Sequence, residues 1–335
     1  MRRLPLFPLR RLCTALLLLT GAPGITIPAG GAGAAGGDGG AVEGGRLASK
    51  PPGARPAEPD KVRGELLLII NEERRAAGAS DLRLSAALNR AAQQHADEIG
   101  QRGSLRAEPR AEDSMDGRLK EAGYEAHEWT ESVTSGPEKL ADVLPAWKEY
   151  DREGTFRKLL DPDYRDLGIG LGRLDGAPLY TFLFAVPAKE AFARQTAGLR
   201  DLSRVRAEML TKVNAVRKHA GVGPLTVDSR LDEAAQRHAE DMLKRSYFAH
   251  QSPDGKSVRE RARATGYNWA TIGENLAEGQ TTVDEVVDSW MHSRAHRENL
   301  LDGRFTQLGL GLAFGRDPRT GSYRILWVQN LGRPR

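Results

Sequence analysis

The chain repeats one unit of sequence, and this duplication constrains its fold more than any other feature. The segment 65–105 resembles the segment 208–248 without gaps. The matched positions, all 143 residues apart, are Asn71 and Asn214, His95 and His238, Gly123 and Gly266, and Trp147 and Trp290. Self-similarity at a fixed offset indicates two copies of one structural unit. We expect these copies to span residues 61–187 and 205–333.

The segments outside the two copies differ from them in composition. Residues 1–35 place arginines ahead of a leucine-rich run and a small-residue stretch, which predicts an export signal cleaved near Ala35. A basic, unfolded N-terminus is the alternative. The apolar run is shorter than the roughly 20 residues of a membrane-spanning helix, so no transmembrane span is expected. Residues 36–60, rich in Gly and Pro, predict a flexible linker, and residues 188–204 predict a charged linker between the copies.

Export changes how the charge and the cysteine content are interpreted. The net charge is +4, and residues 1–35 carry four arginines and no acidic residue, so removal of this segment leaves a neutral chain. A nucleic-acid partner is therefore not expected. The only cysteine, Cys13, lies in the same segment, so the processed chain has neither a disulfide nor a cysteine nucleophile. The predicted location is secreted, either extracellular or periplasmic.

The apolar pattern of the second copy predicts both helices and strands. Helical spacing covers residues 206–219 and 229–245, and Thr282 begins a third helix with a capping box. Alternation then covers residues 307–315 and 323–332, with turn residues between them, which predicts a hairpin. Helices on both faces of a small sheet give an α+β fold, an α-β-α three-layer sandwich in each of two tandem copies.

Three polar residues of the second copy are candidates for chemistry. His250 follows the second predicted helix, Glu274 lies within the segment GEN, and His296 follows the third helix. Imidazole and carboxylate groups together can bind a divalent metal such as zinc, or can transfer protons. Sequence separation does not fix their distances, so a hydrogen-bonded polar cluster that does no chemistry is the alternative.

The motifs around these residues resemble a known family. The stretches YFAHQSPDG, GENLAEG, VVDSWMHSRAHRENLL and FTQLGLGLAF are similar, in order and spacing, to the bacterial branch of the CAP superfamily. These are the SCP-like proteins related to cysteine-rich secretory proteins, antigen 5 and plant pathogenesis-related proteins. The resemblance covers the whole second copy. It implies an α-β-α sandwich with a cleft lined by two histidines and acidic residues, which in several members binds zinc or another divalent cation.

The resemblance assigns roles to individual residues of the second copy. His250, Glu274 and His296 match the cleft positions and are the implied metal ligands. A second acidic position of the family falls on Ser293, so this chain lacks that ligand. The nearby His292 is expected to point to solvent.

The first copy lacks both histidines and is expected to be degenerate. The counterparts of the three site residues are, in order, Ala107, Glu131, and either Glu153 or Thr155, depending on where a two-residue slip in register falls. Any metal is therefore expected in the second copy only. His238 recurs as His95 in the copy without a site, which favours a buried, hydrogen-bonded structural histidine.

Two classes of function follow from the sequence. The first, and the favoured one, is a secreted binding module for an extracellular lipid, glycan, wall component or protein. The second is a metal-dependent hydrolase acting on a cell-wall, peptide or ester substrate, in which His250 and His296 hold the ion and Glu274 acts as the base. No serine nucleophile lies beside these histidines in a recognised motif, which is why binding is favoured.

Overall fold

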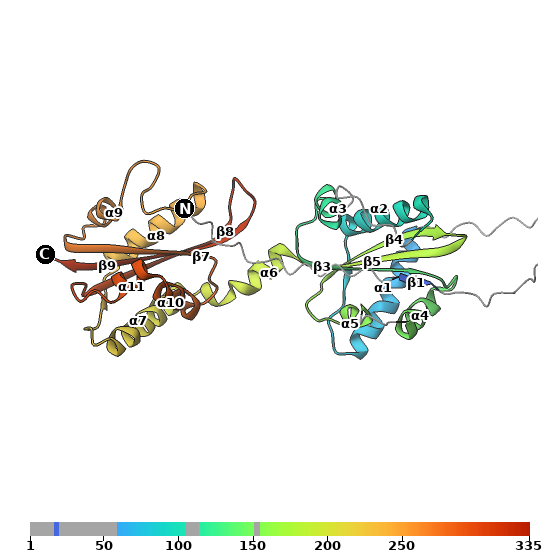
Figure 1. Ribbon diagram of the computed structural model, residues 1–335, viewed down its shortest axis with the longest axis horizontal. Helices are drawn as coiled ribbons and strands as arrows, with labels where there is room; N and C mark the ends of the chain where they lie inside the picture. Colours follow the sequence, from blue (N-terminus) through green and yellow to red (C-terminus); the bar gives the residue numbers. More distant parts are fainter. Residues whose placement is uncertain (1–16, 20–58, 105–113, 151–154) are drawn as a thin grey trace, which may run out of the picture. The chain divides into compact units, whose positions relative to one another are not determined.

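The chain folds as two units, each with its own sheet. The computed structural model describes residues 17–19, 59–104, 114–150 and 155–335 (Figure 1). The first unit spans Met1–Ala191 and the second Phe192–Arg335. The predicted export signal and the linker 36–60 lie almost entirely outside the described residues.

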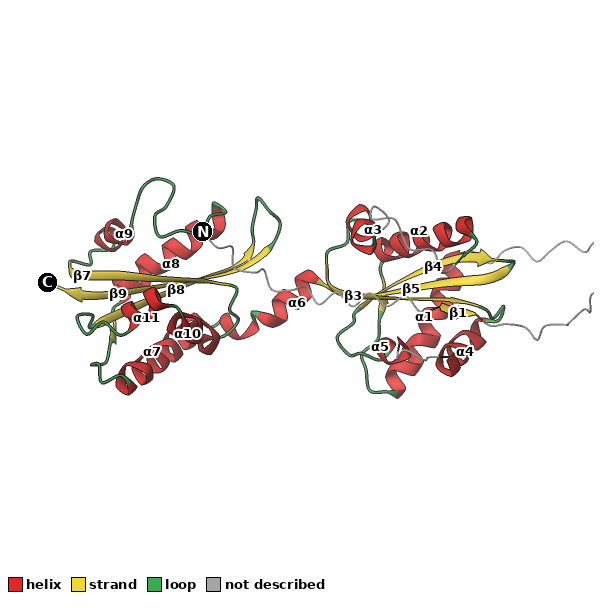
Figure 2. Ribbon diagram, in the orientation of Figure 1, coloured by secondary structure: helices red, strands yellow, loops and turns green. Residues whose placement is uncertain are grey.

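The first unit is a mixed sheet with helices on both faces. Its strands lie in the order β1-β3-β5-β4-β2. Figure 2 shows α2 and α3 on one face and α1, α4 and α5 on the other. The helices are α1 Pro59–Ala76, α2 Ala86–Arg102, α3 Met115–Glu121, α4 Val143–Tyr150 and α5 Thr155–Leu159; the strands are β1 Leu17–Leu19, β2 Arg83–Leu84, β3 Ala126–Ser135, β4 Asp166–Leu174 and β5 Ala177–Pro187. Strand β1 falls inside the predicted export signal and pairs in parallel with the end of β3.

The second unit repeats this architecture. Its strands lie in the order β6-β8-β9-β7, with α8 and α9 on one face and α7, α10 and α11 on the other (Figure 2). Helix α6, Ala188–Gln195, spans the boundary between the two units. The other helices are α7 Leu202–His219, α8 Ser229–Lys244, α9 Val258–Ala264, α10 Val283–His292 and α11 Arg294–Leu300; the strands are β6 Thr226–Val227, β7 Trp269–Glu278, β8 Gln307–Arg316 and β9 Tyr323–Pro334. The predicted three-layer α-β-α sandwich in two copies is confirmed. Residues 188–204 contain α6 and the start of α7.

The third predicted helix begins where its cap requires. The side chain of Thr282 accepts a hydrogen bond from the backbone N–H of Glu285 and caps α10. The Glu285 carboxylate accepts from the N–H of Thr281, one residue earlier than a capping box requires. On the buried face of this helix, Trp290 is fully buried and its Nε1 donates to the carbonyl oxygen of Leu276 on β7 at 3.0 Å.

Glycines allow α8 to lie directly on the sheet. A Cβ atom built at Gly309 or Gly311 of β8 would lie 2.2 Å from the backbone of Leu231 or Ala235 in α8. Real Cβ atoms do not approach backbone this closely, so these two positions admit only glycine with the present packing. The close approach sets the position of α8, which carries His238.

One buried arginine in each unit ties a short helix to the rest of that unit, α5 in the first and α11 in the second. In the second unit Arg217 of α7 is 1% exposed and donates only to backbone carbonyls. Its acceptors are the carbonyl oxygens of Gly223 at 2.7 Å, Leu300 at 2.8 Å, Asp302 at 3.1 Å and Phe305 at 3.0 Å. Arg74 makes the equivalent bonds in the first unit, to Ser80, Leu159, Asp161 and Tyr164. Burial lowers the pKa of Arg217. The arginine thus anchors the end of the helix that carries His296.

Candidate functional site

Glu274 is a buried carboxylate at the centre of the candidate site. It lies on β7, and its side chain is 2% exposed. Its two oxygens are engaged on different sides: Oε2 accepts from Nη2 of Arg261 at 2.6 Å, and Oε1 contacts Nδ1 of His250 at 2.9 Å. A buried charge is tolerated when it is paired and hydrogen-bonded in this way.

Arg261 is a site residue that the sequence analysis missed. It lies on α9, and its Nη2 also donates to the backbone carbonyl of His250 at 3.0 Å. One guanidinium therefore fixes both the carboxylate and the loop that carries the histidine. The first unit has the same pair 143 residues earlier, with Nη2 of Arg118 lying 3.5 Å from Oε2 of Glu131. The repeat offset was the signal that could have revealed it.

His250 occupies the loop between α8 and α9 and faces solvent. Its side chain is 62% exposed. Because Nδ1 contacts the carboxylate of Glu274, that nitrogen carries the proton in the neutral ring, and Nε2 is left with its lone pair for another ligand.

His296 lies on the short helix α11 and is half-buried. Its backbone carbonyl accepts from Nδ2 of Asn275 at 3.3 Å, while Nδ2 of Asn299 donates to the carbonyl of Glu274 at 3.3 Å. Burial lowers the pKa of His296, and the nearby charge of His250 lowers it further. The imidazole of His296 is therefore biased towards its neutral form.

The other two histidines of this region have different environments. His238 of α8 is 1% exposed, and its Nε2 contacts the carbonyl oxygen of Ala249 at 3.0 Å. In the first unit its counterpart His95 contacts Oε1 of Glu131 at 2.8 Å, so a structural histidine there takes the place that His250 has in the second unit. His292 is exposed, and its Nδ1 contacts the backbone carbonyl of Asp288 at 2.7 Å.

The donor atoms of the side chains in this region determine which kind of metal ion it could bind. Within the described ranges, no group of three or more His, Cys, Asp or Glu residues has the arrangement to hold a metal ion. Glu274, predicted as a third ligand, accepts a hydrogen bond from Arg261 at one oxygen and contacts His250 at the other. The imidazole nitrogens of His250 and His296 are the kind of donor atom that zinc binds in proteins.

The environment of His238 predicts a pH-dependent stability. Burial lowers the pKa of His238 below its usual 6.5. Between the lowered pKa and 6.5 the unfolded chain binds a proton that the folded chain does not, so the free energy of unfolding rises with pH in this window. We expect the contribution of neutral His238 to the free energy of unfolding to be fully present above pH 6.5 and to be lost as the pH falls below it. Denaturant unfolding at several pH values should give a shallower dependence for His238→Gln, whereas the exposed His219→Gln should keep it; equal slopes would contradict the assignment.

Comparison with known proteins identifies the family. The sequence profile of the Cysteine-rich secretory protein family, CAP, matches residues 67–184 and 210–331, which is most of both units. The chain belongs to the CAP family, and both of its units are CAP domains. The predicted resemblance is therefore confirmed and extends to the first unit.

Two curated proteins of Bacillus subtilis are similar to part of the chain. The chain is 37% identical over 116 residues to the uncharacterized protein YkwD of Bacillus subtilis, covering 35% of this chain and 45% of that protein. It is 31% identical over 105 residues to the uncharacterized membrane protein YlbC of the same organism, covering 31% and 30%. The chain thus spans less than half the length of these curated relatives.

Solved structures with some similarity include an extracellular protein with an SCP domain from Bacillus anthracis, at 22% identity and a TM-score of 0.37 over 47% of this chain and 53% of that one. A cysteine-rich secretory protein from Staphylococcus aureus has 17% identity and a TM-score of 0.32 over 50% and 55%. No helix in the described part of this chain combines the length and apolar character that crossing a bilayer needs.

Proposed function

We propose that the protein is an exported CAP-domain binding module whose second domain holds a divalent cation on His250 and His296. One observation carries this proposal: Nδ1 of His250 rests on the buried carboxylate of Glu274 at 2.9 Å. Metal-binding histidines commonly donate their second ring N–H to a carboxylate, which fixes the tautomer and the ring orientation. In this arrangement Glu274 acts behind His250 and is not itself a ligand.

The donor set favours particular cations and an incomplete coordination shell. Two imidazoles suit zinc, copper or nickel better than magnesium or calcium, which prefer oxygen. A cation held by His250 and His296 would polarise the molecules that complete its coordination shell. The lowered pKa of His296 supports the same assignment, because only the neutral imidazole can bind a metal.

Hydrolysis is less well supported than binding. A general base must reach a water molecule, and Glu274 is the candidate base. Its side chain is 2% exposed and is paired with Arg261 at 2.6 Å. This pairing stabilises the carboxylate in place and occupies the oxygen that would receive a proton.

Export and the kind of partner rest on the N-terminal sequence and the family. The arginines ahead of a leucine-rich run support an export signal. The similar proteins include the extracellular SCP-domain protein of Bacillus anthracis and an outer surface protein of Borrelia burgdorferi. We therefore infer that the partner is a lipid, glycan, wall component or protein outside the cell.

Zinc titration of the full chain followed by calorimetry tests the cation site. Wild-type protein should bind one zinc ion, and His250→Ala or His296→Ala should lower the affinity at least about tenfold, because each removes a ligand. Glu274→Gln should weaken binding by about 10- to 100-fold, as expected for loss of an outer hydrogen-bond partner. Acidification should weaken binding in all of them because the ring nitrogens become protonated.

His292→Ala is the matched control, since it removes an exposed histidine of the same segment that contacts only the carbonyl of Asp288. It should leave zinc affinity unchanged. Failure of the wild type to bind zinc, or an equal loss in His292→Ala, would show that the two histidines do not form a cation site.

A further inference from the structure

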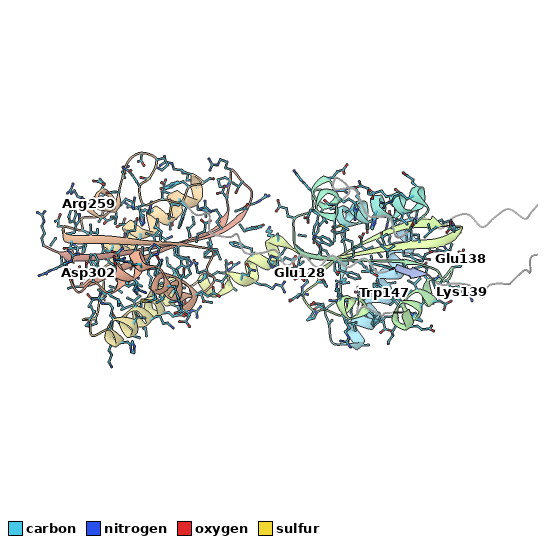
Figure 3. All side chains as sticks on the ribbon, in the orientation of Figure 1. Glu128, Glu138, Lys139, Trp147, Arg259 and Asp302 are labelled. Carbon is cyan, nitrogen blue, oxygen red and sulfur yellow. The ribbon has the colours of Figure 1, made fainter. Side chains whose placement is uncertain are left out.

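Four arginines surround one turn of the second unit, between α9 and β7. Arg259 lies over the ring of Trp269 at 5.6 Å, and Nε of Arg335 donates to the carbonyl oxygen of Trp269 at 3.2 Å. Arg230 lies over the ring of Tyr267 at 5.1 Å. Arg263 is four residues after Arg259 on α9, so both are on the same face of that helix. Figure 3 labels Arg259, which lies on α9. We refer to Arg230, Arg259, Arg263 and Arg335 as the arginine cluster.

Three members of the arginine cluster have no ion pair with a described residue, and Glu260, also on α9, offsets part of their charge through its interaction with Arg263. Arg259, Arg263 and Arg335 are exposed, and none of them forms an ion pair with a described residue. Arg230 is paired with Asp228 at 2.7 Å. Like charges on neighbouring residues repel one another, and a bound anion would relieve this repulsion.

The first domain shows that the fold does not need the arginine cluster. The residues at the equivalent positions, from the repeat offset and the strand register, are Ala87, Asp116, Lys120 and Ala188. One acidic, one basic and two apolar side chains thus replace four arginines on the same scaffold. Trp269 is replaced by Ala126. The cluster is therefore a property of the second domain alone.

Aromatic support makes these guanidinium groups suited to bind phosphate. The rings of Trp269 and Tyr267 hold Arg259 and Arg230 by cation–π contact, so less side-chain freedom is lost when a ligand binds. Guanidinium donors match the oxygens of a phosphate in a two-point hydrogen bond, which an ammonium group cannot do.

We propose that the arginine cluster binds a flexible polyol-phosphate polymer, an anionic chain that carries a phosphodiester in each repeat. Neighbouring arginines on α9 and around the adjoining turn can contact successive phosphates of such a chain. A lipid surface fits less well. The large exposed apolar side chains of the described residues are Leu68, Val227 and Phe248, and none belongs to α9 or to the turn 265–269. Insertion into a membrane interface requires such side chains.

Fluorescence anisotropy with a labelled poly(glycerol phosphate) chain tests the proposal on the full protein. Chelator in the buffer removes any cation from His250 and His296, so the outcome does not depend on that site. Wild type should bind, and the logarithm of its affinity should fall with the logarithm of salt concentration with a slope of about −2, from about 0.7 for each of three neutralised phosphates. Arg259→Glu with Arg263→Glu should lower the affinity at least about tenfold.

The control changes the same net charge elsewhere on the second domain. Arg237 and Arg294 are exposed on other helices. At the same salt concentration, the double variant Arg237→Glu with Arg294→Glu should bind the polymer with an affinity within about twofold of wild type. Equal losses in the two double variants would overturn the proposal, because binding would then follow net charge. Binding to anionic phospholipid vesicles without binding to the polymer would also overturn it. Circular dichroism melting, together with the milder Arg259→Gln and Arg263→Gln pair, checks that the variants fold.

Discussion

Arg261→Met should destabilise the second domain by about 3–5 kcal/mol, because it leaves the carboxylate of Glu274 buried without its cation. The two side chains are 9% and 2% exposed and their atoms lie 2.6 Å apart. Arg261 also holds the backbone of His250. We therefore expect the change to loosen the loop before α9 and to abolish zinc binding at the proposed site.

Hydrogen exchange of the full chain measures this effect with an internal reference. Protection should fall in β7 of the second domain and stay unchanged in β3 of the first. Adding Glu274→Gln to Arg261→Met should restore much of the stability, since the uncompensated charge is then removed. Arg263→Met, exposed on the same helix, should stay within about 0.5 kcal/mol of wild type. A loss no larger than that of Arg263→Met would show that the buried pair does not stabilise the domain.

Gly311→Ala should cost about 3 kcal/mol or more, at the upper end of what overpacking a core does. The new Cβ would lie 2.2 Å from the backbone of Ala235, so α8 would have to move off the sheet. The displacement would carry His238 with it. No side-chain rotation can relieve the clash, because the backbone fixes the position of a Cβ atom and the atoms that it would meet are backbone.

Gly223→Ala is the matched control in the same domain, since a Cβ there has nothing within 4 Å. It should change the free energy of unfolding by less than about 0.5 kcal/mol in denaturant titrations. Similar stabilities of the two variants would mean that α8 and β8 are not packed as closely as described.

The architecture was largely predictable from the sequence because of the repeat. A constant offset of 143 residues relates the two copies. Within one copy, apolar residues at helical spacing indicate helices and alternating apolar residues indicate strands. The family motifs also selected His250, Glu274 and His296, and the structure brings Glu274 and His250 into contact. The number of residues between His250 and Glu274 could not have shown this contact, because the distance between them depends on how α9 folds back between the loop and β7.

The two buried arginines could not be predicted in the same way. Arg261 is one of three arginines at alternate positions of α9, and composition does not tell which one points inwards. Arg217 follows several charged residues on α7 and reads as part of a solvated helix end. Both positions recur at the offset of 143, as Arg118 and Arg74. The pairing of Glu274 with Arg261 was equally hidden, because the sequence does not show whether a carboxylate faces an arginine.

The recurrence of the Arg–Glu pair separates what the two copies share from what differs between them. Both copies keep the pair, as Arg118 with Glu131 and Arg261 with Glu274, whereas only the second carries His250 and His296 on an exposed loop and a short outer helix. Peripheral positions of a CAP domain can thus change while its buried ion pair is kept. Duplication of such a domain leaves one copy free to diverge while it still folds.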